Sequence, residues 1–229
     1  MREADEAAGQ GRLRARPGTS PTGAAAEPGL RPLGLGRGRD GLAYVPAGLD
    51  PARPAPLVLA LHGAGGEGEQ MVRILSPLAD AHGLILLAPD SRGVTWDVIQ
   101  GAYGPDVRLI DAALDQAFRH HAVDPARIAI AGFSDGASYA LSLGLTNGAL
   151  LTHVLAFSPG FMAPAATRDS PRLFVSHGTD DAVLPIERTS RRLVPRLEAA
   201  GYDVAYREFR GGHTVPPDVA AAAVAWFLG

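Results

Sequence analysis

The sequence predicts an α/β fold in which a mainly parallel central sheet is flanked by helices. Two apolar runs, Pro56–Gly63 and Leu84–Pro89, are continuous rather than alternating, which is typical of parallel strands covered on both faces. Residues Asp106–His121 instead repeat apolar residues such as Ile110 and Leu114 at helical spacing. Strands that alternate with helices in this way predict a layered α/β domain.

The remaining elements continue the same alternation along the chain. Gly83 and the pair Asn147–Gly148 each follow a helical pattern, where residues that terminate helices are expected. In chain order, the expected elements are a hairpin at 30–35 and 41–45, a strand at 56–63, a helix at 67–82, a strand at 84–89, a helix at 106–121, a strand at 127–131, a helix at 135–146, strands at 152–157 and 172–176, a helix at 187–200, a strand at 202–209 and a helix from about 216 to 228.

The N-terminal stretch differs from the rest in composition. Residues 1–28 are rich in Ala, Gly, Pro and charges of both signs, and they contain no apolar core of the kind that a secretory signal peptide has. We therefore expect a poorly ordered leader over 1–28, with one short docked segment at most, and a single domain over 29–229.

Composition narrows the function classes. The net charge of −3 argues against a nucleic-acid footprint or a membrane-surface patch. The chain has no cysteine and no lysine, which excludes disulfides, thiolate metal sites, a cysteine nucleophile and a lysine Schiff base. No apolar run reaches membrane-spanning length. We expect a cytoplasmic monomer or homodimer that does not insert into membranes, needs no cofactor or metal, and acts on a small molecule.

The stretch Gly132–Gly136 carries the clearest chemical signal. It reads GFSDG and fits the pattern G-x-S-x-G between a predicted strand and a predicted helix. In that context both glycines are needed because a Cβ would clash with the strand and the helix, and Ser134 is held in a strained turn above the sheet. Ser134 could instead be an ordinary helix N-cap. The flanking strand and helix favour the interpretation as a nucleophile.

A serine nucleophile needs a base, and the base needs an acid that orients it. Asp181 follows the strand at 172–176, and His213 lies in a Gly-Gly turn after the strand at 202–209, in the usual chain order of serine, acid and histidine. Asp180 competes for the role of the acid, and Asp181 is favoured. His177 is expected to hydrogen-bond within the turn that positions the acid.

The chemistry also needs two backbone N–H groups for the oxyanion. Asp135, directly after the nucleophile, should supply one. The second is expected from Ala64 in the stretch HGAGG, where Gly63 and Gly65 let the backbone turn inward and line the substrate site.

Taken together, five stretches resemble the phospholipase/carboxylesterase family of α/β-hydrolases, which includes acyl-protein thioesterases and small bacterial carboxylesterases. They are LHGAGG, APDSRGVTWD, DPARIAIAGFSDGAS, HGTDDAVLP and GGHTVPP, and the similarity runs from about residue 55 to the end. The resemblance implies that Ser134, Asp181 and His213 form a catalytic triad, with Asp181 as the acid of an HG-x-x-D motif.

The chain also departs from that family. Asp135 stands where the family often has glutamine, which makes a thioesterase-like preference less expected. The short stretch SRGVTWD predicts an open site without a lid or a large cap. Trp96 within it either lines the acyl or alcohol pocket or packs at an edge.

These features predict a serine hydrolase that cleaves short- to medium-chain carboxylic esters through an acyl-enzyme intermediate. Thioesters, aryl esters and polyesters are alternative substrates on the same site. An inactive hydrolase-fold domain that only binds a ligand is the alternative from another class, since a fold does not fix a function.

Overall fold

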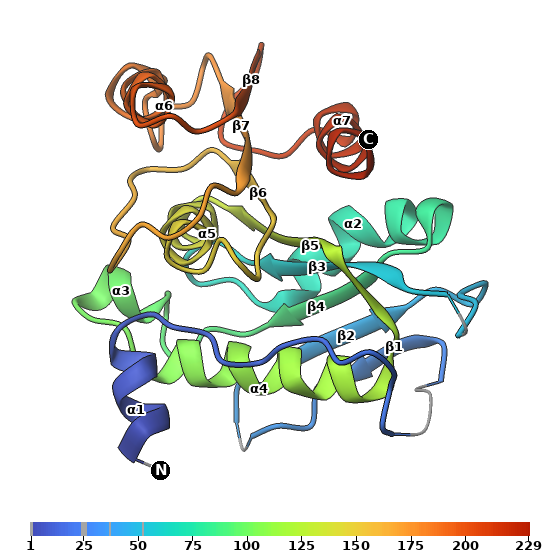
Figure 1. Ribbon diagram of the computed structural model, residues 1–229. Coiled ribbons are helices and arrows are strands. Elements are labelled where there is room, and N and C mark those ends of the chain that lie inside the picture. The colour runs from blue at the N-terminus through green and yellow to red at the C-terminus, as the bar shows by residue number, and fades with distance from the viewer. Residues whose placement is uncertain (1, 24–26, 37, 52) are drawn as a thin grey trace.

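An eight-stranded sheet forms the centre of the molecule, with strand order β1-β2-β4-β3-β5-β6-β7-β8 (Figure 1). This computed structural model describes residues 2–23, 27–36, 38–51 and 53–229. The pairs β1–β2 and β2–β4 are antiparallel, and the other neighbours are parallel. The strands are β1 (Gly29–Pro32), β2 (Gly41–Val45), β3 (Ala55–Leu61), β4 (Ile85–Pro89), β5 (Val123–Phe133), β6 (His153–Phe157), β7 (Arg172–Gly178) and β8 (Val204–Phe209).

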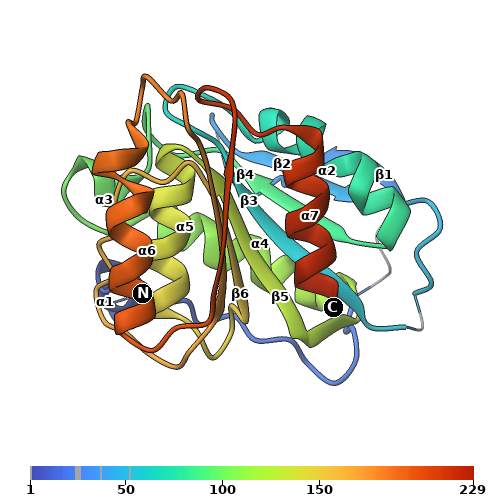
Figure 2. The same cartoon turned by 90° about the horizontal axis from the view of Figure 1, so that it is seen from above.

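Helices cover both faces of the sheet. Helices α2 and α7 lie on one face, and α4, α5 and α6 lie on the other (Figures 1 and 2). The helices are α1 (Arg2–Gly9), α2 (Gly68–His82), α3 (Asp97–Gln100), α4 (Pro105–His120), α5 (Asp135–Thr146), α6 (Ser190–Ala199) and α7 (Pro217–Leu228), with a 3-10 turn η1 at Ile186–Arg188. The expected mainly parallel α/β-hydrolase architecture without a large cap is confirmed.

The core follows from the continuous apolar strands. Residues 57–61 of β3 are all fully buried, and their side chains alternate between the two faces. Leu57, Leu59 and Leu61 belong to the cluster beneath α4 and α5, whereas Val58 and Ala60 belong to the cluster beneath α2 and α7. The apolar run in the sequence therefore reports burial on both sides.

The clearest departures from the expected elements have local causes, and most other boundaries shift by one to three residues. Strand β5 begins at Val123 because that residue already pairs with Ala55 of β3. The helix expected at 187–200 is divided into η1 and α6 because Thr189 has a non-helical backbone (φ −120°, ψ −103°). The short helix α3 was not expected, and Pro105 at the start of α4 separates the two helices.

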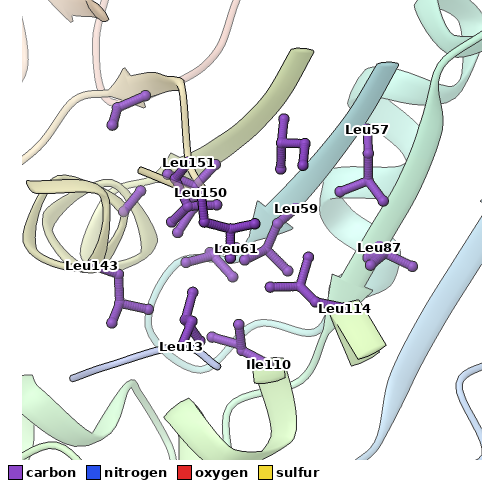
Figure 3. Close-up of a cluster of buried hydrophobic side chains, with 14 of the residues drawn as sticks. Leu13, Leu57, Leu59, Leu61, Leu87, Ile110, Leu114, Leu143, Leu150 and Leu151 are labelled. Atoms are coloured by element: carbon purple, nitrogen blue, oxygen red, sulfur yellow. The ribbon is translucent and has the colours of Figure 1, made fainter. Parts of the chain in front are cut away.

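The described part of the N-terminal leader contains a helix and packs on the domain. Helix α1 packs against α4, and the segment after it runs along α4 (Figure 1). Leu13 is only 3% exposed and packs in the core among Ile110, Leu114 and Leu143 (Figure 3).

Side chains distant in sequence bind the backbone of this segment. Asn147 accepts a hydrogen bond from the Leu13 N–H (2.8 Å) and donates one to the Gly11 carbonyl (2.8 Å). Asp111 accepts the N–H groups of Arg14 and Ala15 at 2.7 and 2.8 Å. Composition could not indicate this docking, because its hydrogen-bond partners lie about a hundred residues away. A domain boundary at residue 28 stays a prediction, and residues 24–26 lie outside the described part.

Within the residues that the structure describes, no helix is both long enough and apolar enough to span a membrane.

Candidate active site

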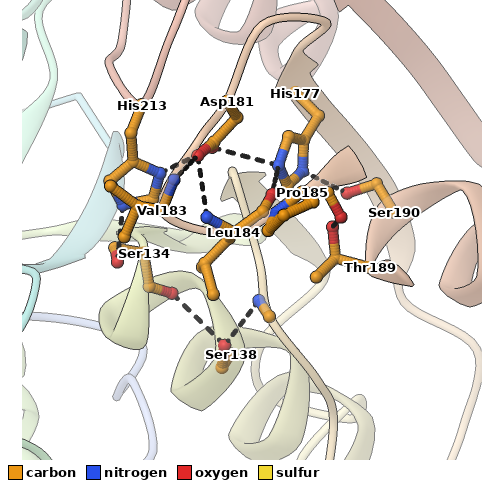
Figure 4. A network of polar contacts seen from close by, with 11 residues as sticks. Ser134, Ser138, His177, Asp181, Val183, Leu184, Pro185, Thr189, Ser190 and His213 are labelled. Atoms are coloured by element: carbon orange, nitrogen blue, oxygen red, sulfur yellow. Dashed lines mark hydrogen bonds and ion pairs between the residues drawn. The ribbon is translucent and has the colours of Figure 1, made fainter. Parts of the chain in front are cut away.

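The candidate residues meet where parallel strands end. Ser134 follows β5, Asp181 follows β7 and His213 follows β8, and these strands point the same way in one sheet. Loops at the carboxyl ends of such strands are where α/β proteins place their sites. Figure 4 shows the three side chains directed toward one another.

Ser134 occupies a strained turn, as expected. Its backbone has φ 57° and ψ −119°, a conformation that is uncommon for residues other than glycine. A Cβ on Gly132 would lie 2.1 Å from the Gly136 carbonyl oxygen, and one on Gly136 would lie 2.2 Å from the Leu61 carbonyl oxygen. The Ser134 hydroxyl makes no N-cap hydrogen bond to α5. Both glycines are therefore needed to bring β5 into α5 at this angle.

The hydroxyl lies next to the predicted base. His213 Nε2 is 2.8 Å from Ser134 Oγ, and His213 Nδ1 is 2.6 Å from Asp181 Oδ2. Asp181 is buried, whereas the neighbouring Asp180 is exposed. The geometry thus brings together Ser134, His213 and Asp181 and leaves Asp180 out.

Asp181 is held as a carboxylate. Burial alone would raise the pKa of Asp181, but hydrogen bonds from the Leu184 N–H and from His213 outweigh it and the pKa is lowered. Its Oδ1 accepts the N–H groups of Val183 (2.9 Å) and Leu184 (2.8 Å). The turn after β7 therefore stabilises the negative charge that the histidine requires.

The two expected oxyanion donors border the serine. Asp135 is the first residue of α5, and Ala64 lies in the exposed loop after β3. Among the described residues, neither backbone N–H donates to a protein acceptor. Gly63 also contacts Ser134, since a Cβ on this glycine would lie 3.4 Å from the Ser134 Cβ. The Gly65 N–H is not available in the same way, because it donates to the Val94 carbonyl (2.7 Å).

The ring of His62 contacts the backbone of the loop that carries Ala64. Burial lowers the pKa of His62, so the ring is neutral. Its Nδ1 lies 2.7 Å from the Gly63 carbonyl, and its Nε2 accepts the Ser91 N–H at 2.9 Å. Arg39 adds hydrogen bonds to the carbonyls of Ser91 (2.8 Å) and Gly66 (2.5 Å). Sequence reasoning missed the role of Arg39, which lies in the β1–β2 connection.

Trp96 does not line a pocket. It is fully buried, donates from Nε1 to the His62 carbonyl (2.9 Å), and stacks on Tyr139 with ring centroids 5.2 Å apart. The pocket role considered from the sequence is therefore corrected to core packing beneath the Ala64 loop. Its neighbour Thr95 is the polar contact of this stretch, since its hydroxyl donates to Asp135 Oδ2 at 2.7 Å.

A hollow of about 530 Å³ opens beside Ser134 toward helix α2. Gln70 lines it and is half-buried, and among the described residues its carboxamide has no hydrogen-bond partner. Val183 also lines the hollow and is 66% exposed. The other lining residues are Gly63, Ala64, Gly65, Gly66, Glu67, Glu69, Arg73, Phe133, Ser134 and His213. The described residues contain no cluster of side chains suited to a metal ion.

Comparison with curated proteins finds esterases. The chain is 29% identical over 158 residues to feruloyl esterase C of Emericella nidulans, covering 66% of this chain and 57% of that protein. It is 31% identical over 105 residues to acyl-protein thioesterase 1 of Gibberella zeae, covering 41% of this chain and 44% of that protein. The chain therefore spans little more than half the length of the first of these relatives, and less than half of the second.

Comparison with solved structures agrees on the fold. The crystal structure of esterase PE8 matches with a TM-score of 0.66 and 23% identity, covering 90% of this chain and 99% of that one. The Bacillus cereus carboxylesterase matches with a TM-score of 0.62 and 21% identity, covering 81% of this chain and 92% of that one. The family model described as Phospholipase/Carboxylesterase matches residues 99–227, which is more than half of the chain. This protein therefore belongs to the phospholipase/carboxylesterase family of α/β-hydrolases.

Proposed function

We propose that this chain is a serine esterase that cleaves carboxylic esters through an acyl-enzyme intermediate. The observation that carries the proposal is the continuous contact from Ser134 Oγ to His213 Nε2 (2.8 Å) and from His213 Nδ1 to Asp181 Oδ2 (2.6 Å). An inactive binding domain would have no physical need for this alignment, or for a serine held at φ 57°.

In the proposed reaction, Ser134 Oγ attacks the ester carbonyl carbon while His213 Nε2 accepts the hydroxyl proton. Asp181 keeps the proton on Nδ1 and stabilises the imidazolium that forms. The tetrahedral intermediate collapses, and His213 gives its proton to the departing alkoxide, so that an alcohol and an acyl-serine result. Water, deprotonated by the same histidine, then attacks the acyl carbon and releases the acid and free Ser134.

The N–H groups of Ala64 and Asp135 are the proposed oxyanion donors. Neither N–H has an acceptor in the part of the chain that the structure describes, which supports this role, because a donor already satisfied would have to break a bond before it could stabilise the transition state. The contact of Thr95 with the Asp135 side chain fixes the start of α5 beside the loop that carries Ala64.

The site favours short- to medium-chain esters. Its apolar lining side chains are Ala64, Phe133 and Val183, while Glu67, Glu69, Gln70 and Arg73 also line the hollow. A long acyl chain gains about 0.8 kcal/mol for each CH₂ that it buries, and this hollow offers it charged side chains instead. We propose that the Gln70 carboxamide hydrogen-bonds a polar group of the acid or alcohol part of the substrate.

A panel of p-nitrophenyl esters from acetate to palmitate tests the proposal, with Ser134→Ala as the reference variant. Loss of the nucleophile should lower kcat by roughly 10⁶-fold, and a fluorophosphonate probe should label wild type alone. Mutant activity within about tenfold of wild type, a difference of only ~1.4 kcal/mol, would disprove the assignment.

The same panel should include a feruloyl ester and an acyl thioester, because relatives of this chain are named a feruloyl esterase and an acyl-protein thioesterase. We expect kcat/KM to peak at short to medium acyl chains. A steady rise out to palmitate would contradict the size limit while leaving the esterase chemistry in place.

A further inference from the structure

His177 makes three polar contacts beside the proposed triad. It is the penultimate residue of strand β7 and is fully buried. Its Nε2 lies 2.8 Å from the Leu184 carbonyl oxygen and 3.1 Å from Asp181 Oδ2, and its Nδ1 lies 2.7 Å from Ser190 Oγ (Figure 4). The ring thus touches the acid, the turn that holds the acid, and the first residue of α6.

These contacts determine where the proton lies. Both neighbours of Nε2 accept hydrogen bonds only, since one is a carbonyl and the other a carboxylate, so Nε2 must carry the proton. Burial lowers the pKa of His177, which keeps the ring neutral. Nδ1 is then an acceptor, and the Ser190 hydroxyl donates to it. Ser190 therefore satisfies the remaining ring nitrogen in the tautomer in which Nε2–H faces the Leu184 carbonyl and Asp181.

Two imidazoles consequently lie against one carboxylate oxygen. Asp181 Oδ2 accepts a hydrogen bond from His213 Nδ1 at 2.6 Å, and His177 Nε2 lies 3.1 Å from the same oxygen. His177 also fixes Leu184, whose N–H binds the other oxygen of Asp181 at 2.8 Å. The carboxylate is thus held on both oxygens through a single buried ring.

We propose that His177 is a positioning residue for the triad acid, which orients Asp181 and limits how strongly that carboxylate attracts the proton on His213. The inference rests on the proposed function. The positive end of the Nε2–H dipole beside Oδ2 lowers the electrostatic attraction of that oxygen for the proton on His213, so the contact serves more than the packing of the turn.

The carboxylate that lies opposite His177 in the sheet already has a cationic partner. Across the β7–β8 pairing, Glu208 lies opposite His177 and is bound by Arg191 at 2.6 Å. Burial makes His177 itself a poor proton acceptor. A change in the pH dependence after substitution of His177 should therefore report on Asp181 and His213.

The test compares His177→Phe, which removes the donor, with His177→Gln, which keeps an N–H near the position of Nε2. The matched control is Thr189→Val. Thr189 donates to the Pro185 carbonyl at 3.0 Å and so fastens the same turn, yet it makes no hydrogen bond to Asp181. Thermal melts of each variant separate folding from kinetics.

We expect kcat of His177→Phe to fall about 10- to 100-fold, the range for losing a hydrogen bond to a charged group, with little change in KM. The acid limb of its kcat/KM profile should move to higher pH, because the freed carboxylate holds the protonated form of His213 more strongly. His177→Gln should restore most of kcat and the profile, and Thr189→Val should leave both unchanged.

Equal losses in the Phe, Gln and Val variants with an unchanged pH profile would overturn the inference, because a purely structural role predicts that pattern. Full kcat in His177→Phe would overturn it as well. Imidazole NMR of wild type gives a readout that does not depend on the Phe variant folding, since an Nδ1–H tautomer of His177 would also refute the proposal.

Failure of the proposed function gives a different result. In that case, wild type and Ser134→Ala behave alike on every ester. The NMR titration of His213 then decides the inference without any turnover: a shift in His177→Phe that His177→Gln largely reverses supports it, and superimposable titrations of all three contradict it.

Discussion

Replacing Leu13 by alanine tests whether the N-terminal segment belongs to the folded domain. The side chain is 3% exposed and packs among Ile110, Leu114 and Leu143. Buried leucine-to-alanine changes cost about 2–5 kcal/mol. We take ~3 kcal/mol, because the N-terminal segment that carries residue 13 can move inward and partly fill the cavity. For a chain of this size each kcal/mol lowers Tm by about 2–4 °C. The expected fall in Tm is therefore about 6–12 °C.

The assay is thermal unfolding followed by circular dichroism, with Leu30→Ala as the matched control. Leu30 is 53% exposed on edge strand β1, so its loss should change stability by no more than about 0.5 kcal/mol. Esterase activity at 25 °C should be retained in both variants, because neither residue lies near Ser134. If the two variants melt within about 2 °C of each other, the packing of Leu13 contributes nothing and the segment is separable from the domain.

Three further changes test other parts of the structure. Gly136→Ala should destabilise the fold by about 1–3 kcal/mol or more in chemical denaturation, because the new Cβ would lie 2.2 Å from the Leu61 carbonyl oxygen; an unchanged midpoint would contradict this. Thr95→Val should lower kcat roughly tenfold by removing the donor to Asp135, and Thr95→Ser should preserve it; equal rates in both would refute the role. Burial lowers the pKa of His153 to about 4, against about 6.5 in the unfolded chain, so its contribution to stability is present above about 6.5 and is lost as the pH falls through about 4. In urea titrations, the free energy of unfolding of His153→Phe should therefore fall by about 3 kcal/mol less than that of wild type as the pH is lowered from about 6.5 to about 4. Identical losses would disprove the lowered pKa of His153.

Most of the features that determine the position of the candidate site could be predicted from the sequence. Ser134, Asp181 and His213 each follow a strand whose apolar run is evident, and parallel strands in one sheet bring their carboxyl ends together. The two glycines around Ser134 could be interpreted in advance, because their steric role depends only on the strand and helix beside them.

Other features depend on contacts between distant segments, and no local pattern reports them. Arg39 reaches the carbonyl of Ser91, 52 residues further along the chain. Trp96 is a residue type that often lines pockets. Only its hydrogen bond to the His62 carbonyl and its stacking on Tyr139 show that it belongs to the core. The burial of Leu13 likewise depends on the side chain of Asn147, 134 residues away.

The position of β8 has a consequence for how the molecule loses activity. This strand is the last in the sheet order, it pairs only with β7, and its residues are mostly half-buried. Regions with an exposed edge and few buried contacts open locally at lower free energy than the core. His213 follows this strand and contacts Ser134, which lies 79 residues earlier in the chain. Detachment of β8 therefore separates the proposed base from the proposed nucleophile while β3, β4 and β5 remain folded. Mild denaturant should therefore abolish turnover before the far-UV circular dichroism changes, and amide protons of β8 should exchange faster than those of β5.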